Sequence, residues 1–335
     1  MESISREHFE SILKGRPFTE DEAYELADKI IDGLLPNSQL AAILTVLRTR
    51  LPNADEIRGF KCALLARTPK IPVLKTPVLD LCGTGGDGKS TFNISTTTAF
   101  VCAALGVTVA KHGNYSFTSK CGSSNLIEGL KVNFAKDPEQ AKLSLERFNL
   151  AFLHAPDWHT SLKNIAPIRK ELGFPTIFNL LGPIANPINP ELRVVGVYSP
   201  AIQSLYRDVL LKESSEFAIV HSLDGYDEIS LTGAARIIYR GREQHLNSES
   251  FGAKSVSPQA IQGGTSLEEN VSIVQAILDG HGSTEQTDVV SSNAAIALLL
   301  AQEKLDLKSG FKLAKECILS GEPGKLLRKM QDFKL

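Results

Sequence analysis

The stretch PVLDLCGTGGDGKS, residues 77–90, decides how the chain is built. Its first half is short, apolar and rich in β-formers, and its second half is rich in glycine, which predicts a strand that feeds a glycine loop. A helix-forming run, TTTAFVCAALG (96–106), and another apolar run, VTVAKHG (107–113), follow it. A strand, a loop, a helix and a further strand in this order are typical of βαβ organisation, so we expect an α/β unit here.

Before this stretch the pattern is helical. Thr19 and Glu22 form a capping-box pair, which predicts the start of a helix. Each stripe of apolar residues at helical spacing needs an apolar partner, so we predict a small helical bundle in the first 70 residues. The three stripes are Ala23, Leu26, Ala27, Ile30, Ile31 and Leu34; Leu40, Ile43, Leu44 and Leu47; and Ile57, Phe60 and Leu64.

The α/β pattern continues toward the C-terminus. We predict further strands at AFLHA (151–155), RVVGVY (193–198) and EFAIVHS (216–222). Helical patterns cover 137–148, 160–172, 201–213, 266–279, 288–303 and 308–320. The sequence contains no internal repeat that would indicate a solenoid.

The composition is that of a soluble globular enzyme, with 42% hydrophobic and 22% charged residues in a chain of 335. The formal charge is −2, from 36 Lys plus Arg and 38 Asp plus Glu, which argues against a general nucleic-acid binder. No apolar run reaches the roughly 18 residues of a membrane-spanning helix, and the sequence starts without a secretion-signal pattern, so we expect a cytosolic protein. The cysteines, at 62, 82, 102, 121 and 317, form no CxxC pair, which argues against a zinc site or a disulfide frame.

The glycine loop fits more than one nucleotide-binding pattern. Gly83, Gly85 and Gly88 match GxGxxG, while Gly83 and Gly88 with Lys89 and Ser90 match GxxxxGK[ST]. In both patterns glycines let backbone N–H groups approach phosphate oxygens. A dinucleotide site needs an acidic residue after the next strand, but this strand ends in KHG. An ATP-binding loop needs a helix directly after GKS, but the residues that follow are poor helix starters. A tight turn without a ligand is the remaining alternative, and four glycines in six residues argue against it.

Two further anion-binding segments follow the glycine loop. Asn93, Ser95 and Thr96 can cap a helix whose N-terminal N–H groups favour phosphate, and Lys111 adds a cation. A third loop is rich in hydroxyl and amide groups: Asn114, Ser116, Thr118, Ser119, Lys120, Gly122, Ser123 and Ser124. One ligand with two separated phosphate groups suits this series, and phosphoribosyl pyrophosphate (PRPP) has that form.

The motifs together carry a resemblance to a known family. DLCGTGGDG, NIST, KHGN and SKCGSSN follow one another between residues 80 and 125, and IAPIRKELG (165–173), FNLLGPIANP (178–187) and DEISLTG (227–233) come later. In this order and spacing they resemble the consecutive motifs of the anthranilate phosphoribosyltransferase family. The resemblance covers essentially the whole chain. It implies an α/β fold in which a small helical lobe and a larger α/β lobe with a central mixed sheet enclose a cleft.

The resemblance also implies how the chain is divided. Residues 1–72 form the helical lobe, with a later contribution from about 135–175. Residues 73–134 and 176–335 form the lobe that binds PRPP. Members of the family are usually homodimers through the helical lobe, so a homodimer is implied here.

Site residues are carried over where this sequence matches a family motif. For PRPP they are Gly83, Gly85, Gly86, Asp87, Gly88, Thr91, Asn93, Ser95, Thr96, Lys111 and Ser123. For anthranilate they are Gly83, Asn114, His159, Arg169 and Gly182. The metal ligands are Ser95, Asp227 and Glu228, which implies Mg²⁺ as the cofactor, with two ions. The chemistry agrees, because Mg²⁺ prefers carboxylate and phosphate oxygens and a guanidinium group suits a carboxylate. We expect the two acidic residues to lie in the loop after EFAIVHS, and no residue is assigned as catalytic acid or base.

The implied reaction is the displacement of pyrophosphate from PRPP by the amine of anthranilate, a step of tryptophan biosynthesis. The implied partners are these two small molecules and a second copy of the chain. We expect neither nucleic acid nor a membrane as a partner, and a cytoplasmic location. The sequence departs from the family pattern at four places: Tyr115 stands where arginine is common, Cys121 replaces a serine, Asp157-Trp158-His159-Thr160 replaces a commoner ending His-Pro, and Phe174-Pro175 stands where valine-arginine is usual. The phosphate and metal residues match the family, and the departure at 157–160 concerns the acceptor.

Three alternatives share parts of this pattern. A pyrimidine nucleoside phosphorylase would have the same fold but lack the DEIS pair. A nucleic-acid-binding paralogue would show an excess of basic residues, which the charge of −2 does not. An ATP-using P-loop protein would need an acidic Walker-B strand, and no convincing one follows in the sequence.

Overall fold

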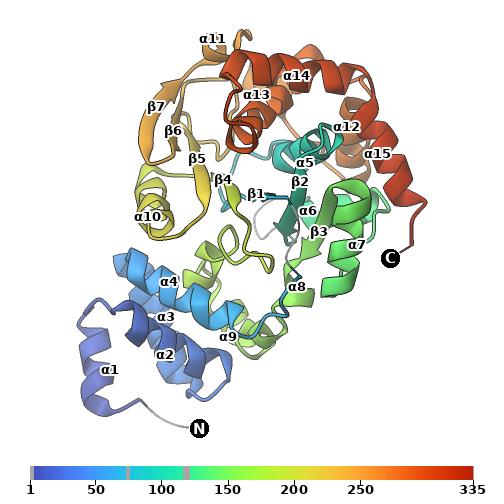
Figure 1. The fold of residues 1–335 in the computed structure, drawn as a ribbon. Helices are drawn as coiled ribbons and strands as arrows, with labels where there is room; N and C mark the ends of the chain where they lie inside the picture. The colour runs from blue at the N-terminus through green and yellow to red at the C-terminus, as the bar shows by residue number, and fades with distance from the viewer. Residues whose placement is uncertain (1–3, 73–75, 116–120, 335) are drawn as a thin grey trace.

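The structure, a computed structural model, describes residues 4–72, 76–115 and 121–334 (Figure 1). The N-terminal part is helical, as expected, and consists of α1 (Arg6–Leu13), α2 (Glu20–Ile31), α3 (Asn37–Arg50) and α4 (Ala54–Leu65). The capping box is present, since Thr19 Oγ1 accepts from the Glu22 N–H and the Glu22 carboxylate accepts from the Thr19 N–H. The predicted apolar stripes are buried except at Leu34, which follows the end of α2 and is half-buried, while the neighbouring Leu35 is buried.

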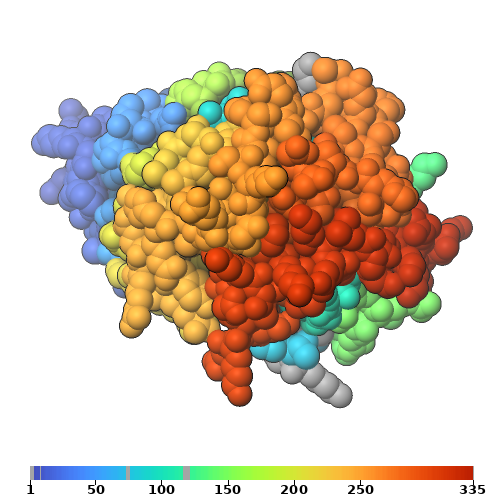
Figure 2. All heavy atoms as spheres, turned by 90° about the horizontal axis from the view of Figure 1, so that it is seen from above, coloured from blue at the N-terminus to red at the C-terminus, as the bar shows by residue number. Residues whose placement is uncertain are grey.

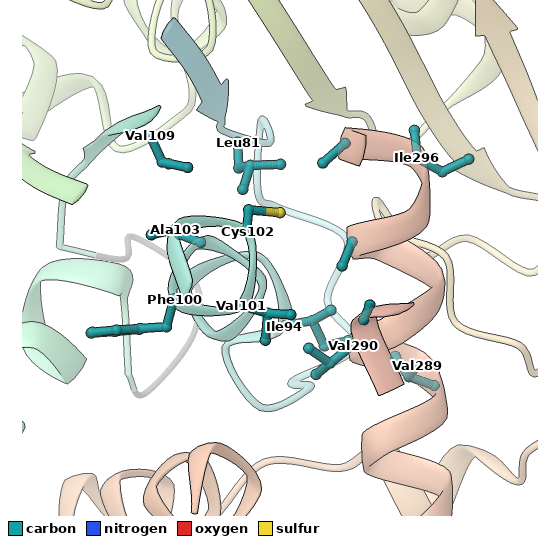
Figure 3. Packing of buried hydrophobic residues seen from close by; sticks show 14 of the residues in the cluster. Leu81, Ile94, Phe100, Val101, Cys102, Ala103, Val109, Val289, Val290 and Ile296 are labelled. Atoms are coloured by element: carbon teal, nitrogen blue, oxygen red, sulfur yellow. The ribbon is translucent and has the colours of Figure 1, made fainter. Parts of the chain in front are cut away.

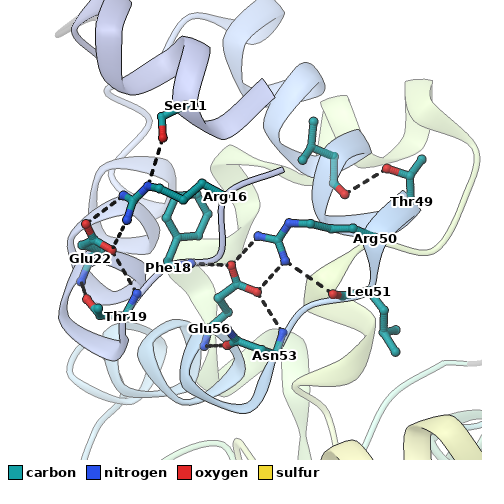
Figure 4. Close-up of polar contacts among 11 residues, drawn as sticks. Ser11, Arg16, Phe18, Thr19, Glu22, Thr49, Arg50, Leu51, Asn53 and Glu56 are labelled. Atoms are coloured by element: carbon teal, nitrogen blue, oxygen red, sulfur yellow. Dashed lines mark hydrogen bonds and ion pairs between the residues drawn. The ribbon is translucent and has the colours of Figure 1, made fainter. Parts of the chain in front are cut away.

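A buried ion pair holds the helical lobe together (Figure 4). The Glu56 side chain, at the start of α4, is fully buried. Its carboxylate accepts hydrogen bonds from both terminal guanidinium nitrogens of Arg50, from the Phe18 N–H at 2.9 Å and from the Asn53 N–H at 2.8 Å. These bonds satisfy the buried charge and join the end of α3 to the start of α4 and to the loop before α2.

The larger part is built on one seven-stranded sheet in the order β3-β2-β1-β4-β5-β6-β7. Five neighbouring strands run parallel: β1 (Val78–Leu81), β2 (Thr108–Gly113), β3 (Leu150–His154), β4 (Leu192–Gly196) and β5 (Glu216–Ser222). The strands β6 (Ala235–Tyr239) and β7 (Arg242–Leu246) are antiparallel, so the sheet is mixed, as expected. The helices among and after these strands are α5 (Ile94–Ala104), α6 (Ser123–Gly129), α7 (Pro138–Phe148), α8 (Ala155–Trp158), η1 (Thr160–Asn164), α9 (Ala166–Leu172), η2 (Ile177–Leu180), α10 (Pro200–Leu210), α11 (Ser248–Phe251), η3 (Pro258–Ile261), α12 (Leu267–Leu278), α13 (Thr284–Ala301), α14 (Leu307–Leu319) and α15 (Glu322–Gln331).

The central strands are buried on both faces of the sheet. Successive residues of a strand point to opposite faces, so one strand contributes to two cores. In β5, Ala218 and Val220 join a core with α5 and the C-terminal helices, whereas Phe217 and Ile219 join a core with α10 and the helical lobe. Figure 3 shows the first of these cores, in which apolar side chains of α5 face the strands on one side and α13 on another. The central strands therefore appear in the sequence as unbroken apolar runs, and their carboxyl ends are held in place from both sides.

The expected division into lobes needs one correction. Strand β3 lies at the edge of the sheet, paired with β2, so the part of 135–175 that contains it does not belong to the helical lobe. The segments η1, α9 and η2 do contact α2 and α3, and Phe178 packs edge-on against Phe60 of α4 at 5.6 Å between ring centroids. We propose that the later contribution to the helical lobe is limited to about 160–184. In Figure 2 the N-terminal helices gather at one end of the molecule, away from the C-terminal helices.

Other differences concern single elements. The helix predicted over 160–172 is divided into η1 and α9, because Pro167 has no N–H to donate inside a helix and stands in the first turn of α9 instead. The sequence patterns did not predict β6, β7 or α15. In the part of the chain that the structure describes, no helix combines the length and the apolar character needed to cross a bilayer.

Candidate active site

A cavity of about 560 Å³ lies between the helical lobe and the carboxyl ends of the parallel strands. Leu47, Arg48 and Leu64 line it from the helical lobe, and the loops that follow β1, β2, β4 and β5 line it from the sheet. Ligands of open parallel sheets bind at this edge, where the loops are free of the sheet's hydrogen bonds. The cavity is therefore the position where we expect the predicted site residues.

The glycine loop after β1 lies against the loop after β5. Gly85, Gly86 and Gly88 have φ values of +60°, +81° and +69°, which glycine adopts without strain. The Gly85 N–H donates to Asp227 Oδ2 at 3.1 Å. A Cβ at Gly83 would lie only 2.8 Å from the same oxygen, so the close approach of the two loops requires glycine there.

The geometry does not fit an ATP-binding P-loop. Lys89 is not among the residues that line the cavity, and its Nζ lies over the ring of Tyr226, 4.8 Å from the centroid. Helix α5 begins at Ile94 rather than directly after Lys89. A P-loop lysine would have to point to the phosphate position, so this alternative is wrong.

The acidic pair lies in the loop after β5, as expected, and both carboxyl groups line the cavity. Burial, followed by repulsion from the Asp87 carboxylate, raises the pKa of Asp227 to about 7. Burial and the charges of Asp227 and Asp87 raise the pKa of Glu228 well above its usual value. Glu228 Oε1 accepts the Ser95 N–H of the first turn of α5 at 3.0 Å. Asp87 Oδ2 is buried, and no described residue donates a hydrogen bond to it. Three carboxylates thus crowd one end of the cavity, where a bound cation would relieve their repulsion.

The structure agrees with the chemistry of a magnesium site. Among the described residues no three His, Cys, Asp or Glu side chains are arranged to enclose a metal ion. Asp227 and Glu228 supply two neighbouring carboxylates, and among the described residues no group donates a hydrogen bond to the Asp87 oxygen beside them. The other coordination positions of a bound metal are left to water and phosphate. Mg²⁺ commonly binds in this way, so the residues fit it.

Lys111 and the start of α5 lie beside the carboxylates. The ammonium group of Lys111 is buried and donates to the Leu81 carbonyl and, at 3.1 Å, to Ser95 Oγ. Asn93 occupies the N-cap position of α5 but does not cap it with its side chain, contrary to expectation, and instead donates from Nδ2 to the Cys121 carbonyl. Among the described residues, Asn93 Oδ1 and Thr96 Oγ1 are buried and have no hydrogen-bond partner. Buried polar atoms are nearly always paired, so these two point to a polar ligand.

The predicted acceptor residues lie at another part of the cavity wall. Arg169, in α9, donates to Asn179 Oδ1 at 3.2 Å and lies over the Phe178 ring. Burial lowers the pKa of its guanidinium, and within the described residues it has no acidic partner. Asn114 accepts at Oδ1 from the Tyr115 N–H at 2.7 Å. A half-buried guanidinium without a carboxylate suits an anionic ligand.

The two histidines in the cavity wall differ in the hydrogen bonds of their ring nitrogens. Both ring nitrogens of His159 have partners, since Nε2 lies 3.0 Å from the Ala185 carbonyl and Nδ1 lies 3.1 Å from Thr68 Oγ1. Burial lowers the pKa of His159 to about 3, so the ring is neutral and structural. His112 donates from Nδ1 to the Gly182 carbonyl at 3.0 Å, and burial lowers its pKa. Its Nε2 is therefore an acceptor, and within the described part of the chain it is buried without a partner.

The cavity collects nearly all of the predicted site residues. Those that line it are Gly83, Gly85, Gly86, Asp87, Thr91, Asn93, Ser95, Thr96, Lys111, Asn114, Ser123, His159, Arg169, Gly182, Asp227 and Glu228. Gly88 does not line it and serves the turn of the loop. The predicted anion-binding residues Ser116, Thr118, Ser119 and Lys120 lie outside the described residues. The site residues carried over from the motifs did not include His112 or Thr176, which also line the cavity. Among the described residues His112 Nε2 and Thr176 Oγ1 are buried and have no partner; KHGN contained the signal for the first, and Thr176 had none.

Two family domains match consecutive parts of the chain. The helical bundle domain of a glycosyl transferase family matches residues 6–68, and the a/b domain of a glycosyl transferase family matches residues 75–323. Together they cover the helical lobe and nearly all of the α/β lobe.

Relatives along the full chain agree with these matches. Anthranilate phosphoribosyltransferase of Flavobacterium johnsoniae is 42% identical over 324 residues, which are 97% of this chain and 98% of the relative. The crystal structure of anthranilate phosphoribosyltransferase from Thermus thermophilus superposes with a TM-score of 0.91 at 34% identity, covering 96% of this chain and 98% of that one. The Saccharomyces cerevisiae enzyme in complex with PRPP and Mg superposes with a TM-score of 0.88 at 26% identity, covering 98% of each chain. The chain, with its matching motifs, lobes and cavity, therefore belongs to the anthranilate phosphoribosyltransferase family.

Proposed function

We propose that this protein transfers the phosphoribosyl group of PRPP to the amine of anthranilate and releases pyrophosphate. The observation that carries the proposal is one cavity with two chemically different ends. One end has a glycine loop, a buried lysine and clustered carboxylates, and the other has Arg169, which has no acidic partner in the described chain. The first end suits the phosphate groups of PRPP, and the second suits the carboxylate of anthranilate. The named activity of the full-length relatives supports the assignment.

The pyrophosphate and the ribose phosphate would lie against the glycine loop and the start of α5. Backbone N–H groups of a positive-φ glycine loop can approach phosphate oxygens without a Cβ in the way. A Cβ at Gly85 or Gly88 would meet no protein atom within 4 Å, so the space beside these glycines is open. The unpaired oxygens of Asn93 and Thr96 would bond to the ligand there, and Lys111 would neutralise charge while it orients Ser95.

Asp227 and Glu228, with Ser95, would hold Mg²⁺, and we propose two ions. When bound, Mg²⁺ neutralises the charge of pyrophosphate and so makes it a better leaving group. The pKa of both carboxyl groups is raised without metal, and a nearby cation would lower it, so both groups would hold the metal as carboxylates. The S. cerevisiae relative in complex with PRPP and Mg supports magnesium as the metal.

Anthranilate would lie with its carboxylate on Arg169 and its ring along the wall that includes Gly182. Asn114 would donate from its amide nitrogen, because its oxygen is already engaged by the Tyr115 N–H. His112 Nε2 can accept a hydrogen bond from the incoming amine, which the paired nitrogens of His159 cannot. His159 then acts through packing, edge-on against His112 at 5.2 Å between ring centroids.

Catalysis on this arrangement comes mainly from alignment. The amine nitrogen attacks the anomeric carbon of PRPP as the bond to pyrophosphate breaks, and positive charge develops on the ribose. The protein holds the two reactants in one geometry and stabilises the charge that collects on the leaving group. The amine of anthranilate is neutral near pH 7, so it attacks without first losing a proton. The nitrogen carries an extra proton once the bond to the ribose has formed, and this proton is released to solvent.

We propose a homodimer and a cytoplasmic location as well. The family resemblance supports the dimer, and the helical lobe, through which it would form, exposes Leu13 at 49% and Tyr24 at 36%. The cysteines described are free thiols, which suits a reducing compartment.

The proposal is tested by following anthranilate fluorescence in the presence of PRPP and MgCl₂. We expect the fluorescence to fall with time and to stop falling when EDTA is added. Loss of signal should disappear if PRPP is omitted. Stable anthranilate fluorescence together with phosphate-dependent cleavage of thymidine would contradict the proposal and favour a pyrimidine nucleoside phosphorylase.

A further inference from the structure

The lysine of the GKS motif has no part in the phosphate chemistry described above. Lys89 is exposed and does not line the cavity. Its ammonium group instead lies 4.8 Å from the ring centroid of Tyr226, which is only 5% exposed. A cation at this distance from an aromatic face is attracted by the ring. The contact joins the last part of the glycine loop to the residue directly before Asp227.

The two loops also meet at a second point. The Gly85 N–H donates to Asp227 Oδ2 at 3.1 Å, at the cavity end of the loops. Lys89 meets the loop after β5 outside the cavity. There the side chain passes close to the backbone, since a Cβ at Gly225 would lie 3.2 Å from Lys89 Cε. Two contacts at separate points fix both the distance and the relative orientation of the loops, which one contact alone would not.

Backbone and side-chain hydrogen bonds hold both partners of this contact in place. The Lys89 N–H donates to Asp87 Oδ1 at 3.0 Å, which places its side chain on the same turn. The Tyr226 carbonyl accepts the Ser222 N–H at 2.9 Å, which holds the backbone of Tyr226 at the end of β5. Lys89 therefore contacts a buried ring whose backbone is fixed to the sheet.

We infer that Lys89 is a positioning residue that locks the glycine loop onto the loop carrying Asp227 and Glu228 and so preorganises the pyrophosphate position. The inference rests on the proposed function, because it assigns pyrophosphate to the space between these loops. Lys89 acts through Tyr226 and touches no substrate. Its loss weakens pyrophosphate binding and leaves the acceptor end unchanged.

The test is calorimetric titration of the full chain with inorganic pyrophosphate in MgCl₂, and separately with anthranilate. An exposed cation–π contact predicts that Lys89→Met weakens pyrophosphate binding about 2- to 5-fold. Lys89→Arg should restore the wild-type affinity, and Tyr226→Phe, which keeps the ring, should retain it. Lys254→Met, which removes an exposed lysine far along the sequence, is the control for lost charge. The affinity for anthranilate should be the same in all variants.

A double variant separates coupling from simple charge loss. If the contact positions the loops, Lys89→Met adds no further loss to Tyr226→Leu, because the partner ring is already absent. Two results would overturn the inference. One is that Lys89→Met lowers the affinity for pyrophosphate equally in the wild type and in Tyr226→Leu. The other is that Lys89→Met does not lower the affinity at all although the wild type binds pyrophosphate. Because Tyr226 is buried, Lys89→Met and Lys89→Arg decide the matter if Tyr226→Leu does not fold. A wild-type protein that fails to bind pyrophosphate would contradict the proposed function instead.

Discussion

Replacing Asp227 and Glu228 by their amides should make the metal-free protein more stable and nearly inactive. Burial, together with nearby carboxylates, raises the pKa of both groups, that of Asp227 from 3.8 to about 7. A shift of that size corresponds to a cost of roughly 4 kcal/mol in the folded state once the carboxyl group is ionised. The amides remove the charge, and the side-chain amide at position 227 would retain an oxygen for the Gly85 N–H. We therefore expect Asp227→Asn/Glu228→Gln to raise the free energy of unfolding by about 1–4 kcal/mol without metal.

The gain should depend on pH in one direction. The folded-state pKa of Asp227 lies above its unfolded value, so this contribution to stability is present below about pH 4 and is lost as the pH rises through about 7. The melting temperature Tm of the double variant should exceed that of the wild type most at about pH 8 and least at about pH 5. Thermal unfolding in EDTA across this range measures the difference.

Activity and metal response give the second half of the test. Losing the charge stabilisation of the leaving group commonly costs on the order of 10²-fold or more in turnover. Added MgCl₂ should raise the Tm of the wild type and leave that of the double variant unchanged. Glu243→Gln, an exposed acid on β7, is the control and should behave as wild type. A double variant that keeps magnesium-dependent turnover, or that is less stable than the wild type at about pH 8 in EDTA, would refute the reasoning.

Three further changes test separate parts of the account. Arg169→Ala removes a charge-assisted pair worth roughly 1.5–3 kcal/mol. Steady-state kinetics should therefore show that KM for anthranilate rises about tenfold or more while KM for PRPP changes little. A rise in KM for PRPP alone would place Arg169 at a phosphate. Gly85→Val forces a branched residue to a φ of +60° and should lower kcat/KM severely, as should Lys111→Ala. Lys89→Ala should lower kcat/KM only mildly. An inactive Lys89→Ala variant together with an active Lys111→Ala variant would contradict this order. Arg50→Met leaves a buried carboxylate unpaired, and urea denaturation should show a loss of about 3–5 kcal/mol, where an unchanged midpoint would contradict a structural role for this pair.

The sequence predicted the fold well where burial leaves a periodic pattern. Strands β1, β2, β4 and β5 are buried on both faces, so they appear as short apolar runs bounded by turn residues. Strand β7, with the sequence REQHL, is almost entirely exposed at the edge of the sheet and leaves no such pattern. Helix α15 begins EPGK after the N-cap residue Gly321, and glycine and proline at such spacing usually indicate a turn. Helix α13 starts at Thr284, earlier than predicted, because Ser283 and Gln286 form a capping box whose signal lay unused in the sequence.

The site could be predicted only as far as local motifs reach. The glycine loop and the acidic pair are contiguous in sequence, so their composition indicated phosphate and magnesium chemistry. Their contact with each other is tertiary, since the Gly85 N–H and the Asp227 carboxylate are separated by 142 residues. The sequence could not show that Lys89 turns away from the cavity to Tyr226 or that both nitrogens of His159 are engaged. These contacts depend on which residues the fold brings beside Lys89 and His159, and local motifs in one sequence do not indicate such tertiary neighbours.

The most direct test of the central claim is to identify both products of one reaction by ³¹P nuclear magnetic resonance. Purified protein is mixed with PRPP, anthranilate and MgCl₂, and the phosphorus signals are followed with time. The account predicts that pyrophosphate and a phosphomonoester of ribosylated anthranilate appear in equal amounts, and that neither appears when anthranilate is omitted. Pyrophosphate released at the same rate without anthranilate, or unchanged PRPP in the complete mixture, would contradict transfer to the amine.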